Sequence, residues 1–95
     1  MPKAVRLVLG FQLDRIQRGN DPSNWKSVTG LGKGISGVRE IRVEVETNIY
    51  RSAYVTKFGD SIAVLHCWEK KTQRMTEADK KVIVERYKAA QDELT

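Results

Sequence analysis

The fold is decided by residues 38–68, which read VREIRVEVETNIYRSAYVTKFGDSIAVLHCW. Side chains alternate along REIRVEVE, so that Ile41, Val43 and Val45 share one face and charged residues occupy the other. A period of two is typical of a strand with one face buried and the other in water. The pattern therefore predicts a half-buried β-strand over about 38–46.

Two turns divide the rest of this stretch into further strands. We expect a two-residue turn at Thr47-Asn48, because asparagine adopts positive φ readily, and a second turn at Gly59-Asp60. The strands between and after them span about 49–58 and 61–68, and both are rich in β-formers. The last strand is apolar on both faces, which predicts a central position in the sheet.

Helices are predicted on both sides of the strands. A helix over about 3–18, ending at Gly19, is indicated by apolar residues at helical spacing: Val5, Leu9, Leu13 and Ile16, with Val8 beside them. A second helix over about 76–94 begins at a Thr76 cap with Asp79 three residues on. Its inner stripe consists of Ile83, Tyr87, Ala90 and Leu94, and Lys80 is expected to face water.

Residues 19–37 are predicted to form a turn-rich loop. Its glycines precede a strand, whereas a phosphate-binding loop follows a strand and opens onto a helix. We therefore expect tight turns here, with Trp25 anchoring the loop in the core. Together these elements predict one α+β domain over 1–95, with a small antiparallel sheet of about three strands, an N-terminal helix packed on it and a C-terminal helix.

Composition narrows the classes of partner and site. The chain has 95 residues and a formal net charge of +5, which favours anionic partners such as nucleic acid or an acidic protein. One cysteine, Cys67, excludes an internal disulfide, and one histidine and one cysteine supply no metal site. No long apolar run or secretion signal is present. We expect a cytoplasmic protein without metal, cofactor or membrane contact.

Strand pairing predicts where the charges converge. The expected turns place Arg42 opposite Ala53, Arg51 opposite Trp68, and Ala53 opposite His66. One face of the sheet then carries Arg42, Arg51, His66, Trp68 and Lys70. The other face, expected to be core, carries Ile41, Val43, Val45, Tyr50, Tyr54, Leu65 and Cys67. Two interpretations of the charged face stay open: a site for an anion, or a solvated face on which Glu44 and Glu69 balance the arginines.

Two segments carry a resemblance to a known family. They read GISGVREIRV and YRSAYVTKFGDSIAVLHCWEKKTQRMTEADKKVIVERY, and they resemble the RelE/ParE toxin superfamily, in particular its phage-derived, HigB-like branch. The resemblance covers about residues 3–90 and is densest in YR, YVTKFGDSIAVLH and EKKTQ. It implies a compact α/β toxin fold and a type II toxin–antitoxin system. It also implies an endoribonuclease that cuts mRNA on the ribosome, and an acidic antitoxin of helix-turn-helix type.

The resemblance also implies roles for individual residues. In ribonucleases of this superfamily the ribose 2′-OH attacks the adjacent phosphorus, which requires a base, an acid and cations that stabilise the transition state. The catalytic positions that match are Arg51, His66, Lys70 and Lys71. Substrate binding is expected from Arg42, Trp68 and Arg74, with Trp68 either stacking on a base or packing against the C-terminal helix.

The sequence departs from the family pattern in two ways. Branch members usually carry a strand and a helix before the helix that begins here, so a fourth strand is expected in the family but not in this chain. The sheet edge left exposed would allow homo-oligomerisation. In addition, no tyrosine follows KKTQ, and Glu40 stands where some of these enzymes have a lysine. Two alternatives to RNA cleavage follow: a gyrase-directed, ParE-like toxin, or a non-catalytic remnant that binds an antitoxin or nucleic acid.

Overall fold

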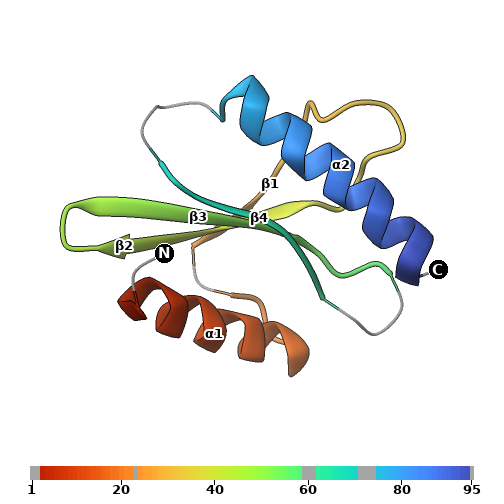
Figure 1. Cartoon of the computed structure of the whole chain (residues 1–95). Helices are drawn as coiled ribbons and strands as arrows, with labels where there is room; N and C mark the ends of the chain where they lie inside the picture. Colours follow the sequence, from red (N-terminus) through yellow and green to blue (C-terminus); the bar gives the residue numbers. More distant parts are fainter. Residues whose placement is uncertain (1–2, 23, 59–61, 71–74, 95) are drawn as a thin grey trace.

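The protein is an α+β sandwich of three layers. The computed structural model describes residues 3–22, 24–58, 62–70 and 75–94. Its elements are, in order, α1 (Lys3–Gln17), β1 (Trp25–Ser27), β2 (Arg39–Val45), β3 (Asn48–Val55), β4 (Ala63–Glu69) and α2 (Glu77–Leu94). The strands form one antiparallel sheet in the order β1-β2-β3-β4, with α1 and α2 on opposite faces (Figure 1). The predicted fold class is confirmed.

The core on the α1 side of the sheet follows the alternation in the sequence. Val5 and Leu9 of α1 pack on the apolar face of β2 and β3, which consists of Ile41, Val43, Tyr50 and Tyr54. Val8, which the spacing placed beside this stripe, is instead 40% exposed. Residues four apart share a helix face, so Val5 and Leu9 face the sheet while Val8 lies on a different side of the helix.

The core on the α2 side depends on an irregularity in β4. Ala53 pairs with His66 but Tyr54 pairs with Val64, so Leu65 is left out of the register. Leu65 therefore packs with Ile83 and Tyr87 of α2, although strict alternation assigned it to the other face. Its carbonyl accepts a hydrogen bond from Arg86 Nη1 at 3.1 Å. Cys67, also predicted to be core, is exposed.

The hairpin between β2 and β3 turns one residue earlier than predicted. Val45 pairs with Asn48, so the turn consists of Glu46 and Thr47, and Glu46 has the positive φ of 56°. Arg42 consequently lies opposite Arg51, and not opposite Ala53. A shift of two residues along the partner strand keeps every side chain on its predicted face, because the period of a strand is two.

The loop predicted over 19–37 contains the fourth strand. Trp25 of β1 pairs with Ile41, and Ser27 pairs with Arg39. Strand β4 pairs only with β3, and β1 joins the sheet beside β2, so β4 is an edge strand and not the predicted central one. Trp25 is 36% exposed, so it does not anchor the loop in the core as predicted. The Arg39 guanidinium instead lies over its ring, 4.1 Å from the centroid.

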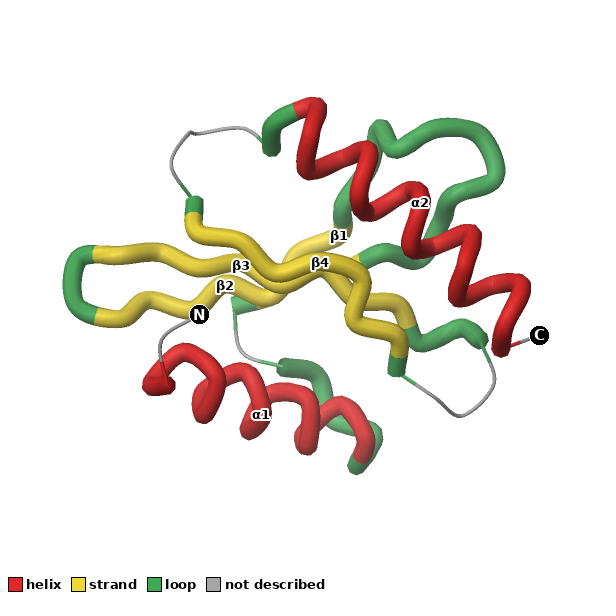
Figure 2. The backbone as a smooth tube through the Cα atoms, viewed as in Figure 1, coloured by secondary structure: helices red, strands yellow, loops and turns green. Residues whose placement is uncertain are grey.

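The rest of that loop covers α2. Between β1 and β2 the chain runs beside the helix (Figure 2), and Val28, Leu31 and Ile35 pack against the α2-side core. The turn back to β2 uses Gly37 at a φ of 74°, which side chains rarely adopt. Within the described ranges, neither helix combines the length and apolar character needed to cross a membrane.

Candidate anion-binding site

A basic depression lies on the α2 side of the sheet, near β1. It consists of two hollows that share Lys26, Glu40 and Arg51. The smaller hollow, of about 200 Å³, adds Asn24, Trp25 and Arg42. The larger, of about 480 Å³, adds Ser27, Val28, Thr29, Met75, Glu77 and Lys80. Strands β1, β2 and β3 and the first turns of α2 thus all contribute to the basic depression.

The floor of the basic depression is a buried ion pair. Arg51 and Glu40 stand on neighbouring strands, and Arg51 Nη1 donates a hydrogen bond to Glu40 Oε1. Their side chains are 9% and 3% exposed. Arg51 Nε, however, is buried without a hydrogen-bond partner among the described residues. An unmet buried donor costs roughly 1–3 kcal/mol, so the hydrogen-bonding capacity of Arg51 is only partly satisfied by Glu40.

Further cations surround this pair. Arg42 lies directly opposite Arg51, an arrangement of like charges that is unfavourable by itself. Each arginine has its own acid: Arg42 Nη2 lies 2.8 Å from Glu44 Oε1, and Arg51 has Glu40. The predicted pairing of Arg42 with Glu44 is therefore confirmed. Arg51, however, pairs with Glu40 and not with Glu69. Lys26 pairs in register with Glu40, which places it on this same face.

Lys70 follows β4 and is affected by the same charges. Desolvation lowers the pKa of the Lys70 ammonium, and the nearby cations Arg51, Arg42 and Lys26 lower it further, in that order. Glu40 acts in the opposite direction. A lysine with a lowered pKa is partly neutral closer to physiological pH, so it can accept a proton as well as donate one.

His66 and Trp68 form a second, separate arrangement on the same face. Their rings stack with centroids 5.0 Å apart and an interplanar angle of 14°. His66 Nε2 donates to Asp79 Oδ1 at 2.9 Å, because an ionised carboxylate can only accept. Trp68 also packs against the α2-side core, as one of its two predicted roles required.

Asp79 connects His66 to the start of α2. Thr76 Oγ1 accepts from the Asp79 backbone N–H at 3.1 Å and donates to Asp79 Oδ2 at 2.7 Å, so the predicted cap is confirmed. Burial raises the pKa of the Asp79 carboxyl, but hydrogen bonds from His66 and Thr76 outweigh it and the net shift is downward. The first turn of α2 is thereby fixed against β4.

The predicted site residues thus fall into three groups. Arg42 and Arg51 line the basic depression, and Lys70 lies within electrostatic reach of it. His66 and Trp68 do not line it. Lys71 and Arg74 lie outside the described residues. The catalytic and binding roles assigned to all seven stay predictions.

Two lining cations were not among the predicted site residues. Lys26 lies in the segment predicted to be loop, and its place depends on the unforeseen strand β1. Lys80 was expected to face water, but it lines the larger hollow, with Nζ 3.4 Å from Glu77 Oε1. The excess of basic residues in the chain was the only sequence feature that indicated a binding role for either lysine.

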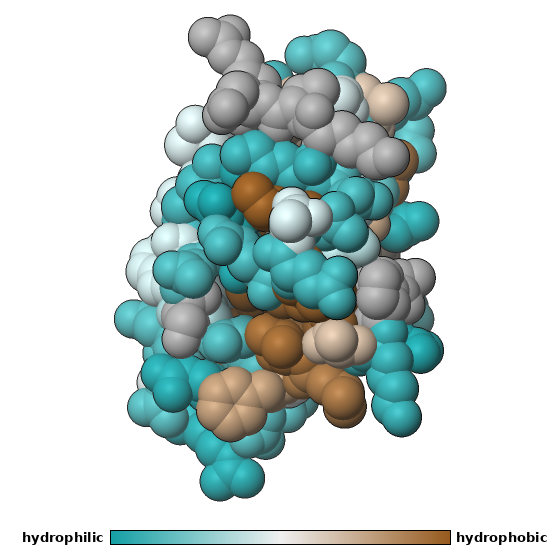
Figure 3. Space-filling model, turned by 90° about the vertical axis from the view of Figure 1, so that its left-hand side faces the viewer, coloured by the Kyte–Doolittle hydropathy of each residue, from teal (hydrophilic) through white to brown (hydrophobic). Residues whose placement is uncertain are grey.

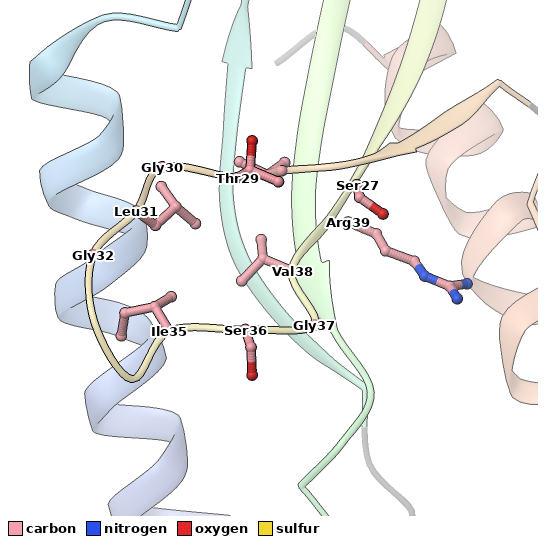
Figure 4. Close-up of a pocket in the computed structure, with 11 residues that line it drawn as sticks. Ser27, Thr29, Gly30, Leu31, Gly32, Ile35, Ser36, Gly37, Val38 and Arg39 are labelled. Atoms are coloured by element: carbon pink, nitrogen blue, oxygen red, sulfur yellow. The ribbon is translucent and has the colours of Figure 1, made fainter.

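A third hollow, of about 620 Å³, lies within the loop of residues 27–39 and has a different character. Figure 4 shows Leu31, Ile35 and Val38 pointing into the space that the loop encloses, whereas the Arg39 guanidinium points away from it. Apolar side chains that line a turn-rich loop indicate packing against α2. We therefore place the candidate site at the basic depression.

Comparison with known proteins gives one match. A family model described as "Phage derived protein Gp49-like (DUF891)" matches residues 1–88. This range includes every described residue of the basic depression. No curated protein and no solved structure matches the chain.

Proposed function

The chain belongs to the phage-derived Gp49-like family, and from this membership and the basic depression we propose that it is a toxin that cleaves mRNA. The Gp49-like family is one of toxin-like proteins, which supports the first half of the proposal. The observation that carries the second half is the convergence of cations on a depression whose floor holds an unpaired arginine N–H. We place the protein in a type II toxin–antitoxin system, where an acidic antitoxin neutralises it.

The proposed reaction is attack of a ribose 2′-OH on the adjacent phosphate, without metal. Arg51 and Arg42 hold the non-bridging oxygens and stabilise the charge that grows in the transition state. Arginine does not titrate, so proton transfer falls to another group. Lys70, whose pKa is lowered, accepts the 2′-OH proton in its neutral form.

His66 has a distinct role in this proposal. Two contacts orient the His66 ring and therefore its Nδ1. Nε2 is hydrogen-bonded to Asp79, and the face of the ring stacks on Trp68. We assign His66 the protonation of the departing 5′-oxygen, as the resemblance implies; this requires that Nδ1 carries the proton that is transferred and that the substrate extends beyond the depression to the ring. Lys71 keeps the catalytic role that the resemblance implies, and Arg74 is assigned to substrate binding.

A second candidate function is favoured by one observation. Glu40 neutralises Arg51 inside the depression, and a carboxylate beside the scissile phosphate repels it. A protein that binds RNA or an acidic partner without cutting it tolerates this charge better than a nuclease does. The second candidate is therefore a non-catalytic member of the family.

Two lysine variants test the proposal, because both residues are peripheral to the core. Lys70→Gln and Lys26→Gln are compared with Lys88→Gln, a matched neutralisation on the exposed side of α2. After induced expression in bacteria, growth is followed and the 5′ ends of transcripts are mapped. Loss of a general base lowers cleavage by about 10²–10⁴-fold, so Lys70→Gln should leave transcripts intact, while Lys88→Gln cuts like the wild type.

The outcomes separate the two candidates. Cleavage that is unchanged in Lys70→Gln would show that the assigned base is wrong. Wild-type protein that binds RNA in vitro but leaves no cut transcripts in cells would establish the non-catalytic alternative. The rate of cleavage should also rise with pH until Lys70 is neutral, and this dependence should be absent from Lys70→Gln.

A further inference from the structure

Helix α1 carries a second apolar stripe that the fold leaves uncovered. Ala4, Leu7, Val8 and Phe11 recur at the spacing i, i+3, i+4 and i+7 and are all exposed. Leu7 is 65% and Phe11 61% exposed. Figure 3 shows apolar surface gathered on the half of the molecule where α1 lies. We call these four residues the outer stripe of α1.

The spacing distinguishes the outer stripe from scattered apolar residues. Single exposed leucines are common and need no explanation, but a continuous row over two helical turns is the pattern by which one helix docks on another. The opposite side of α1 already packs on the sheet through Val5 and Leu9. Helix α1 is therefore apolar on two sides, and the fold covers only one of them.

The charges around the outer stripe indicate what covers it. Helix α1 and the residue after it carry Lys3, Arg6, Arg15 and Arg18 against one acid, Asp14, which gives a net charge of +3 (4 − 1). Asp14 is itself paired with Arg18 at 2.9 Å. A second copy of the chain would bring the same +3 to the interface and a total of +5. Electrostatic complementarity therefore favours an acidic occupant over self-association.

We propose that the outer stripe of α1 is the docking surface for an acidic amphipathic helix of a protein partner. Leu7 and Phe11 supply the apolar anchors, Val8 and Ala4 complete the row, and Lys3 and Arg6 meet the carboxylates that flank the partner's apolar stripe. Because α1 and the basic depression lie on opposite faces of the sheet, a helix docked here leaves the depression open (Figure 1). The proposal does not depend on RNA cleavage.

The test uses a synthetic peptide as the probe. A fluorescent amphipathic peptide carries leucines at the spacing i, i+3, i+4 and i+7 and glutamates on both flanks. A matched control peptide has lysine at every glutamate position. Binding is measured by fluorescence anisotropy against wild-type protein, the double variant Leu7→Ser/Phe11→Ser, and Lys26→Gln/Lys80→Gln, which alters the basic depression alone.

The expected result has three parts. The acidic peptide binds the wild type, and the α1 double variant weakens binding by at least about tenfold. The depression variant binds as well as the wild type. The lysine peptide binds at least about tenfold more weakly than the acidic one. Circular dichroism of the α1 variant should match the wild type, because both substituted side chains face water.

Four results would overturn the proposal. One is an acidic peptide that binds the α1 variant as well as the wild type, and another is loss of its binding in the depression variant. The third is a concentration-dependent dimer in sedimentation that Leu7→Ser/Phe11→Ser disrupts, which would make a second copy the occupant. Binding of the wild type to phosphatidylserine vesicles that exceeds peptide binding, and that the α1 variant abolishes, would instead assign the stripe to a membrane surface.

Discussion

The two faces of the sheet are covered by helices that lie over different strands. Helix α1 packs chiefly on β2, and α2 chiefly on β4. The α1 side therefore leaves β4 uncovered, where Val64 is 45% exposed and Cys67 is exposed. On the α2 side, Lys26 of β1, Glu40 of β2 and Arg51 of β3 line the basic depression beside the first turn of α2.

This difference shows how one sheet supports both a core and a site. On the α1 side, the strand residues that pack against the helix are apolar, while Arg39 and Glu69, which pair with Tyr54 and Tyr50, place charge at the margins of the same face. On the α2 side, the face beside the first turn of α2 holds the ion pair of Arg51 with Glu40, which is buried but borders a hollow. Three variants examine this contrast, in decreasing order of expected effect.

The largest effect is expected for Arg51→Met. The substitution leaves the Glu40 carboxylate buried without its partner, which destabilises a protein by about 3–5 kcal/mol. Urea denaturation followed by circular dichroism measures the change. As a control, Glu40→Met/Arg51→Met replaces both charges and should recover most of the stability. A loss below about 1 kcal/mol for the single variant would mean that Glu40 is solvated, and the contrast between the two faces would be weaker than described.

An intermediate effect is expected for Asp79→Asn, which removes the charged acceptor shared by His66 and Thr76. The expected loss is about 1–3 kcal/mol at neutral pH. The pKa of Asp79 is lowered in the folded state, so its stabilisation is complete above the ordinary aspartate pKa of 3.8 and disappears as the pH falls through the lower, folded value. Denaturation curves across this acid range should show a shallower loss of stability in the variant than in the wild type. Equal slopes would contradict the assignment.

The smallest effect is expected for Leu7→Ser/Phe11→Ser on the outer stripe of α1. Surface substitutions away from packed features usually change stability by less than about 0.5 kcal/mol each. A matched pair within the same helix, Val5→Ser/Leu9→Ser, removes two buried residues and should prevent stable folding. If the outer pair proved as destabilising as the inner pair, the outer stripe would be part of the core and no docking surface would exist.

Much of the fold follows from local patterns in the sequence. The alternation in β2 and the spacing of Val5 and Leu9 depend on neighbours along the chain, so both helices and three strands could be predicted. Strand β1 could not, because three exposed residues in a turn-rich loop carry no period, and they form a strand only by pairing with β2. Because β1 joins the sheet beside β2 and not beside β4, β4 stays at the edge.

The candidate site could be predicted only in part. The error in the hairpin register moved no side chain to the other face of the sheet, so Arg42 and Arg51 were correctly expected to share a side. Lys26 was missed with β1, and the burial of Glu40 could not be anticipated, because alternation marks a charged face as solvated by default. Whether that face meets water depends on which helix covers it, and the sequence of the strand does not contain this information.

The sequence by itself determined the α+β class, the helical cap at Thr76 and the basic surplus, because propensity, spacing and charge are properties of nearby residues. The tertiary structure decided the pairing of Arg51 with Glu40, the bond between His66 and Asp79, and the exposure of Leu7 and Phe11. Each of these depends on where α1 and α2 lie over the sheet. Helix placement is set by packing among residues far apart in the chain, and no local pattern encodes it.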